Sequence, residues 1–420
     1  MSTSTAAGFL TANPHALATI LEASETKSII ASRDIFDVAG IKLWARDQPV
    51  SQALQRKLLD RQLRQPLESC LLVENGVTGR SLVKSLEALL ASSSPLAPLL
   101  APHADELAHA AAHLPLHPVA QLLLTACQAS RTDRFDHAVQ AMALNGALTL
   151  VHGGGTRELR IAMLCGLLHD LGEIYIAPRH GEADADRALD LASYQQLVVH
   201  PHVGRLLVEQ LTNYPPEVAR AIAEHHERLD GSGYPNCLQR HEMSPLGRQL
   251  AVTEAALATL AGDRAHLTHA SVSLRVVPGE FDLHWVGAIA QAARRQPPLA
   301  ASIELEEVER RLTMLDGVLQ AAQSQATALM DSAQSLALKD ALALGLHLLS
   351  RLRMGWNASG LWNGHAIEAQ DCAEVEAIED ELAFRLRAIE RAVLLRARHL
   401  PEADSLRLAL FVESLVPAPN

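Results

Sequence analysis

Hydrophobic residues recur at intervals of three and four along most of the chain, which is the spacing of amphipathic α-helices. One helix is predicted through Leu82 and Leu90 and ends at a linker rich in serine and proline, residues 92–95. The segment from Arg157 to Leu168 is largely apolar, so we expect a buried helix there. The pattern predicts a mainly α protein built on a helical bundle.

The N-terminal part departs from this pattern. Residues 1–32 are rich in Ser, Thr and Ala and are expected to be flexible, apart from one short helix near Leu17. Residues 33–100 carry apolar positions on both sides of a turn at Gly40, followed by an amphipathic helix through Leu54 and the linker helix. We interpret this small α+β region as a structural collar on the larger domain, with a sensory role as the alternative.

Residues 299–420 form a further helical region. They begin with a sustained heptad of apolar positions: Leu305, Val308, Leu312, Leu315, Leu319, Ala322, Ala326, Leu329, Ala333 and Leu336. A break rich in Gly and Asn, residues 355–364, precedes another periodic helix through Val375 and Val393. An antiparallel helical hairpin within the chain and a coiled coil that forms a homodimer fit this pattern equally well.

Composition narrows the classes of function. The 420 residues leave room for two or three domains, and a content of 48% hydrophobic but only 3% aromatic residues requires a core of Leu, Ala and Val. A net charge of −12 without a basic block argues against binding to nucleic acid polymers or to an anionic membrane. The five scattered cysteines lack CxxC spacing and indicate reduced thiols, and no segment has the pattern of a signal peptide or membrane span. We therefore expect a cytoplasmic protein.

The 20 histidines are the anomaly in the composition. Candidate metal ligands recur on or at the ends of predicted helices: His137, His169, Asp170, His200, His225, His226 and Glu254. Adjacent His225 and His226 point about 100° apart on a helix, which fits two metal ions better than one. Asp170 is the natural bridge, since a carboxylate has two oxygens. Such a pair lowers the pKa of a bridging water, which predicts hydrolytic attack on a phosphodiester.

The order of these residues resembles a known family. His137, HDLGE (residues 169–173), HPHVG (residues 200–204) and HHERLDGSGYP (residues 225–235) are similar to the motifs of the HD-GYP family of metal-dependent phosphohydrolases. The resemblance covers about Leu116 to Ala293, within an expected domain of residues 101–298. It implies an all-α HD-type bundle with two or three divalent metal ions, Fe or Mn in preference, and cleavage of cyclic di-GMP to the linear dinucleotide or to GMP.

The resemblance also implies roles for single residues. Six of the residues noted above match the family's ligands directly: His137, His169, Asp170, His200, His225 and His226. Glu254 stands at the place of a later family aspartate. His169, Asp170 and Arg264 are the expected catalytic residues. Three residues of the long motif are expected beside the guanine or its phosphate: Gly233, Tyr234 and Pro235. Arg264 and Arg248 are candidates for phosphate binding, and for Arg248 a plain salt bridge fits equally well.

Several positions depart from the family. Glu173 replaces the lysine of the HDxGK motif, which reverses the charge beside an anionic substrate, and Leu257 replaces a second late aspartate. Glu173 is read as a surface glutamate, as a cause of weak catalysis or altered substrate, or as an extra oxygen ligand. Asp133, four residues before His137, is a candidate for a third metal or an ordinary acidic residue near a helix start. His202 is expected in an outer position, because His200 holds the matching place before Pro201.

Three hypotheses follow. The first is a phosphodiesterase of cyclic di-GMP that uses a metal-bridging hydroxide. The second is a binding module that keeps the ligands but has lost turnover through Glu173 and Leu257, and that passes nucleotide or metal occupancy to the C-terminal helices. The third keeps the enzyme but changes the substrate to another nucleotide.

Overall fold

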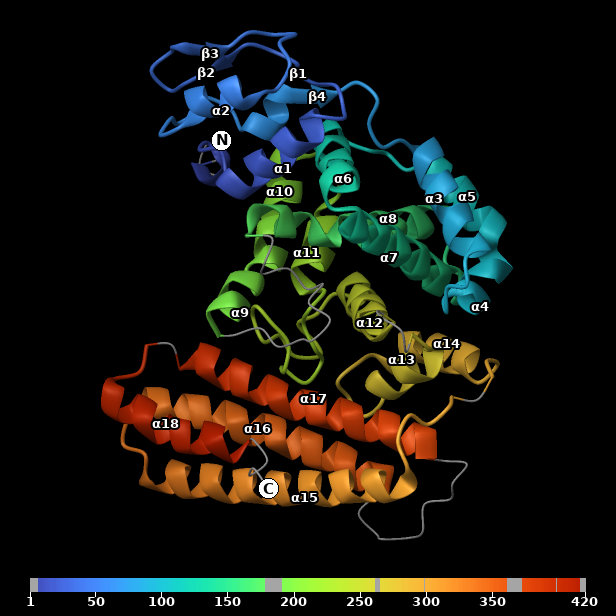
Figure 1. Ribbon diagram of the computed structural model, residues 1–420, viewed down its shortest axis with the longest axis vertical. Helices are drawn as coiled ribbons and strands as arrows, with labels where there is room; N and C mark the ends of the chain where they lie inside the picture. Colours follow the sequence, from blue (N-terminus) through green and yellow to red (C-terminus); the bar gives the residue numbers. More distant parts are fainter. Residues whose placement is uncertain are drawn as a thin grey trace.

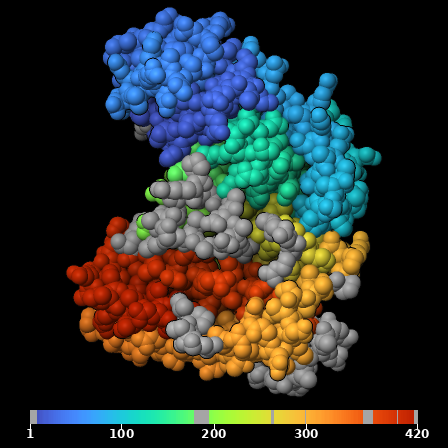
Figure 2. Space-filling model, viewed as in Figure 1, coloured from blue at the N-terminus to red at the C-terminus, as the bar shows by residue number. Residues whose placement is uncertain are grey.

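The computed structural model is dominated by helices, in agreement with the predicted mainly α class (Figure 1). It describes residues 7–177, 191–260, 265–297, 299–360, 372–397 and 399–415. An N-terminal region lies at one end, a central bundle follows, and a layer of C-terminal helices lies at the other end (Figures 1 and 2). Among the described residues, no helix combines the length and apolarity that crossing a bilayer requires.

The N-terminal region contains two small antiparallel sheets. Strand β1 (Ile29–Ala31) pairs with β4 (Leu71–Val73), and β2 (Ile35–Phe36) pairs with β3 (Lys42–Trp44) across the turn at Gly40, whose φ is +88°. Helix α2 (Gln52–Leu58) follows β3, and the short helix η2 (Leu67–Cys70) precedes β4. The predicted hairpin and helix are therefore present.

The N-terminus is more ordered than the sequence suggested. After η1 (Ala7–Phe9), helix α1 (Pro14–Ser24) is capped by the Asn13 side chain and buries an apolar face against α6 (Pro118–Ser130). The expectation of a flexible segment through residue 32 is wrong for β1, because Ile29 and Ala31 are buried in the same core as the central bundle. The helix expected near Leu17 is α1.

The central bundle carries the predicted ligands. Its helices, with those that link it to the N-terminal region, are α3 (Gly79–Ala91), α4 (Ala97–Leu100), η3 (Ala101–His103), α5 (Ala104–Ala112), α6, α7 (Thr132–Val151), α8 (Thr156–Leu168), η4 (His169–Tyr175), α9 (Leu191–Leu197), α10 (His200–Leu211), α11 (Pro216–Glu224), α12 (Pro245–Thr259), α13 (Leu267–Ser273) and α14 (Leu283–Ala293). The largely apolar α8 is buried along α7, as predicted, and it leads directly into η4. This packing holds η4 in the middle of the bundle.

The C-terminal layer consists of α15 (Leu305–Ser332), α16 (Leu336–Ser359), α17 (Cys372–Arg396) and α18 (Glu402–Ser414). The heptad residues of α15 from Val308 to Leu329 are buried against these neighbours, so the hairpin interpretation holds within a four-helix unit. The heptad does not continue to Leu336, which is 84% exposed, because the Ser335 side chain caps a new helix after the chain turns. The homodimer stays a prediction.

Candidate metal centre

Asp170 divides the centre into two halves. Its Oδ2 lies 3.1 Å from Nε2 of His169 and 3.5 Å from Nε2 of His137. Its Oδ1 lies 3.4 Å from Nε2 of both His200 and His225. One carboxylate therefore presents one oxygen to each of two sets of imidazoles, which is the arrangement that a bridging ligand requires.

Two ligand groups result, and Asp170 belongs to both. The first ligand group contains His137, His169, Asp170 and Glu254, and the second contains Asp170, His200, His225 and His226. Within each group the ligand atoms all lie within 4.8 Å of one another. The structure therefore brings together seven of the eight predicted metal ligands, from five separate stretches of the chain.

Helix ends determine which histidine nitrogen points into the centre. His169, His200 and His225 each follow the last residues of a helix (α8, α9 and α11), where backbone carbonyls lack intrahelical partners. The Nδ1 atom of each contacts the carbonyl of the residue three positions earlier, at 2.7, 2.7 and 2.5 Å respectively. Donation from Nδ1–H to this carbonyl leaves the Nε2 lone pair facing the centre, which is how proteins commonly orient metal-binding histidines.

The residues fit a pair of divalent cations. Oδ1 of Asp170 is buried and, among the described residues, receives no hydrogen bond. A buried carboxylate oxygen in this state is costly unless a cation or donor approaches it. Imidazole and carboxylate ligands in this number suit Fe, Mn or Zn. The two ligand groups could therefore each hold one ion, with Asp170 between them.

Electrostatics within the centre favour the same conclusion. Burial opposes charge on Asp170, yet His169 and then the nearby imidazoles of His200 and His225 bring its pKa well below the ordinary range. Burial lowers the pKa of His225 to about 4 and holds the pKa of His226 well below its ordinary value, so both rings are neutral and can act as ligands. The carboxylates raise the pKa of His169 despite its burial, which means that this pocket attracts positive charge.

Glu254 on α12 completes the first ligand group. Its Oε2 lies 3.0 Å from Nε2 of His137 and 3.1 Å from Nε2 of His169, and its side chain is 4% exposed. The carboxylate of this glutamate thus reaches the position expected for the family's shorter aspartate. Leu257, one turn later on α12, presents an apolar side chain to the neighbouring cavity.

The loop after His226 is held by close backbone packing. A Cβ on Gly233 would lie 2.4 Å from Arg228 N and 2.5 Å from His226 O, so the glycine is required by the loop's own packing rather than by a ligand. The Tyr234 ring stacks on the His226 ring, with centroids 4.6 Å apart and an angle of 14°. Tyr234 is therefore a flat surface beside the second ligand group, as predicted, while Pro235 follows it through a cis peptide bond.

Glu173 lies outside both ligand groups. It is buried and forms an ion pair with Arg134, with 2.7 Å between Oε2 and Nη1. The expectation of a surface glutamate is therefore wrong, because Glu173 is buried. The expectation of an extra metal ligand is wrong as well, because the carboxylate is paired with Arg134 and belongs to neither ligand group. Arg134 was not among the residues predicted from the sequence, although its place three residues before His137 was a signal.

The remaining candidates occupy other positions. Asp133 belongs to neither ligand group and is 68% exposed, which is typical of an acidic residue in a first helical turn. Arg248 forms the plain salt bridge, at 3.5 Å from Asp282, and also bonds the Arg240 carbonyl. His202 is exposed, as expected. Arg264 lies outside the described residues.

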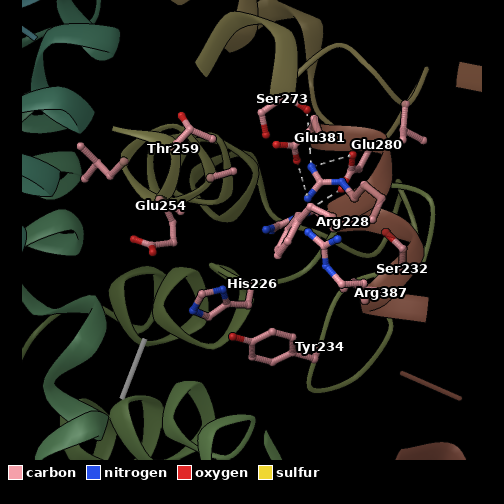
Figure 3. Close-up of a pocket in the computed structure, with 18 of the residues that line it drawn as sticks. His226, Arg228, Ser232, Tyr234, Glu254, Thr259, Ser273, Glu280, Glu381 and Arg387 are labelled. Atoms are coloured by element: carbon pink, nitrogen blue, oxygen red, sulfur yellow. Dashed lines mark hydrogen bonds and ion pairs between the residues drawn. The ribbon is translucent and has the colours of Figure 1, made fainter. Parts of the chain in front are cut away.

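A cavity of about 910 Å³ opens beside the first and second ligand groups (Figure 3). His137, His226, Tyr234 and Glu254 form part of one wall, and α16 and α17 of the C-terminal layer form another. A chain of acids and arginines joins these walls. Glu280 lies 3.2 Å from Arg385 and 3.6 Å from Arg228, and Asp230 lies 3.4 Å from Arg351. The C-terminal helices are thus tied to the loop that follows the paired histidines.

Comparisons with known proteins agree with the motifs. Residues 124–273 match the family model of the HD domain. A stretch of 138 residues is 30% identical to the protein named cyclic di-GMP phosphodiesterase PA4108 of Pseudomonas aeruginosa, and it spans 33% of this chain and 33% of that relative. The solved structure of Bd1817, a HDG"Y"P protein from Bdellovibrio bacteriovorus, superposes with a TM-score of 0.37 and 14% identity over 65% of this chain and 97% of that one. The family match and the curated relative support the resemblance to the HD-GYP family.

Proposed function

We propose that this chain, in which residues 124–273 match the family model of the HD domain, is a metal-dependent phosphodiesterase that hydrolyses cyclic di-GMP. The observation that carries the proposal is the position of Asp170 between two ligand groups. Support for the substrate comes from the similarity to the Pseudomonas aeruginosa relative over a third of its length.

Two divalent cations, Fe or Mn in preference, would be held by the two ligand groups and would neutralise charge on a phosphoryl oxygen and lower the pKa of water. The chain's own residues prepare the rest of the site. Tyr234 and His226 stack on each other at the edge of the cavity, and Tyr234 offers a ring on which a base can pack. The cavity volume of about 910 Å³ is in the range of sites for nucleotide-sized ligands.

The proposal is tested with the full chain, purified without oxygen and loaded with Fe or Mn. Cyclic di-GMP is added, and product is followed by chromatography. We expect the linear dinucleotide or GMP to accumulate, and loss of at least about 100-fold in rate for His200→Ala. His202→Ala is the matched control, because this exposed histidine of the same motif lies outside both ligand groups. No product from protein with bound metal would overturn the proposal.

A second candidate function is a nucleotide-sensing module. It is favoured by the ion pairs that join the cavity loop to α16 and α17, since a ligand in the cavity would touch both walls. Binding of cyclic di-GMP without turnover would support this candidate. Turnover of a different nucleotide in a panel of phosphoesters would support the third hypothesis, a changed substrate.

A further inference from the structure

One face of α17 lies over the cavity, although α17 is outside the matched HD domain. Its residues on the cavity wall include Ala377, Phe384, Ala388 and Ala392, which recur with helical spacing, and the arginines between them. Figure 3 shows Arg387 near Ser232 and Tyr234, on the wall that also carries Glu381. The substrate cavity is therefore built partly from the C-terminal layer.

Most charges on the cavity walls are already paired. Arg385 lies 3.2 Å from Glu280 and 3.1 Å from Glu381, and Arg351 lies 3.4 Å from Asp230. The contacts of Arg385 with Glu280 and of Arg351 with Asp230 join the C-terminal layer to the bundle. The guanidinium groups of these two arginines are held close to the acids, so they are less available to a ligand.

Arg387 differs from these arginines. It is exposed, it lines the cavity, and among the described residues it forms no hydrogen bond or ion pair, although its charge is felt by Glu379 on the same helix. A guanidinium with unused donors on the wall of a cavity fits a phosphate, which it can bind through two parallel hydrogen bonds.

Aromatic rings connect the ligand groups to the same part of α17. Tyr234 stacks on His226, Tyr194 lies edge-on to Tyr234 at 5.9 Å, and the Arg391 guanidinium lies 5.3 Å from the centre of the Tyr194 ring. Arg391 is one helical turn after Arg387, so both point to the same side of α17. The cavity thus offers flat surfaces between the metal centre and a second cationic point, which suits a ligand with two phosphates separated by bases.

We infer that Arg387 of α17 binds the second phosphate of a cyclic dinucleotide while the first lies at the metal centre. This inference rests on the proposed function for its ligand. It assigns a specificity-determining residue to a helix outside the HD domain. A diester with a single phosphate and no base would not reach α17, so its hydrolysis would not depend on Arg387.

The test compares wild-type full chain, Arg387→Ala and Arg396→Ala on two substrates, cyclic di-GMP and bis(p-nitrophenyl) phosphate. Arg396 is the matched control, because it is on the same helix, pairs with Asp340 and is absent from the cavity wall. For Arg387→Ala we expect KM for cyclic di-GMP to rise at least about tenfold with little change in kcat, and bis(p-nitrophenyl) phosphate hydrolysis to stay within about twofold. Arg387→Lys should recover part of the affinity, and Arg396→Ala should behave as wild type.

Each other outcome decides between the inference and the proposed function. If wild type cleaves cyclic di-GMP and Arg387→Ala leaves KM unchanged, the inference is wrong and the proposed function stands. If wild type binds cyclic di-GMP in calorimetry without cleaving it, and Arg387→Ala alone weakens binding about tenfold, the inference stands and the proposed function fails. If wild type neither binds nor cleaves cyclic di-GMP, both are overturned.

Discussion

Arg134 and Glu173 form an ion pair with 2.7 Å between Nη1 and Oε2, and their side chains are only 15% and 4% exposed. Glu173 stands where the HD-GYP motif has lysine, so the sequence alone suggested a reversed charge beside the substrate. The pair shows that the negative charge of Glu173 is balanced by Arg134 of the same chain. A cation on α7 faces an anion on η4, and Arg134 also lines the cavity.

This pair predicts that restoring the family's lysine is harmful. Glu173→Lys would place two cations together in a buried position, and we expect a loss of about 3–5 kcal/mol in the free energy of unfolding. The double variant Arg134→Glu with Glu173→Lys should recover part of that loss, because it restores opposite charges. Urea denaturation of the three proteins measures both effects. Equal stability of Glu173→Lys and wild type would show that the ion pair is unimportant.

The packing of Gly233 gives a second prediction. A Cβ there would meet backbone atoms of His226 and Arg228 at about 2.5 Å, so Gly233→Ala must displace the loop that begins at the paired histidines. We expect a loss of roughly 1–3 kcal/mol in stability and reduced metal content.

Gly317→Ala is the matched control for this substitution. Gly317 is within α15, and, apart from its chain neighbours and the backbone of its own helix, no atom of the described residues lies within 4 Å of the position of its Cβ. Alanine there should leave metal content unchanged and raise stability by about 0.5–1 kcal/mol, because alanine favours the helix. Thermal unfolding and metal analysis of both variants decide the question, and similar behaviour of the two would refute the packing argument.

Much of the centre follows from local sequence, whereas its surroundings do not. His169, His200 and His225 each lie just after a helix end, and helix ends can be read from apolar periodicity. The bridging role of Asp170 follows from the chemistry of a carboxylate next to such a histidine. The partner of Glu173 could not be read in this way, because Arg134 meets it only after α7 and η4 have packed.

Long-range packing also explains the wrong predictions. The segment that forms β1 was predicted to be flexible, but its Ile29 and Ala31 are buried in a core that exists only once the N-terminal region has packed on the bundle. The heptad of α15 predicts a helix without ambiguity. It does not indicate whether its apolar positions pack on a second copy of the protein or on helices of the same chain. Likewise, nothing local indicates that α17 lies over the cavity.

Glu280 predicts a dependence of stability on pH. Burial raises its pKa to about 7, although Arg385 and then Arg228 lower it in part, from an ordinary value of 4.5. Between about pH 4.5 and pH 7, Glu280 is therefore protonated in the folded state and ionised in the unfolded state. Stability from this group is complete below about pH 4.5 and is lost as the pH rises through 7.

Comparison with Glu280→Gln isolates this effect, because glutamine does not titrate. Relative to Glu280→Gln, wild type should lose on the order of 2–3 kcal/mol between pH 5 and pH 8. Unfolding free energies from urea denaturation at the two pH values provide the measurement. A constant difference between the two proteins would show that Glu280 is already ionised at pH 5.

Metal content of Asp170→Ala tests the central claim most directly. The two ligand groups share Asp170, so its removal should empty both, while Asp133→Ala, which removes an exposed aspartate outside them, should have no effect. Plasma mass spectrometry of proteins purified without oxygen should give about two divalent ions per chain for wild type and Asp133→Ala and far fewer for Asp170→Ala. Equal metal content in Asp170→Ala and wild type would contradict the account of a centre bridged by this carboxylate.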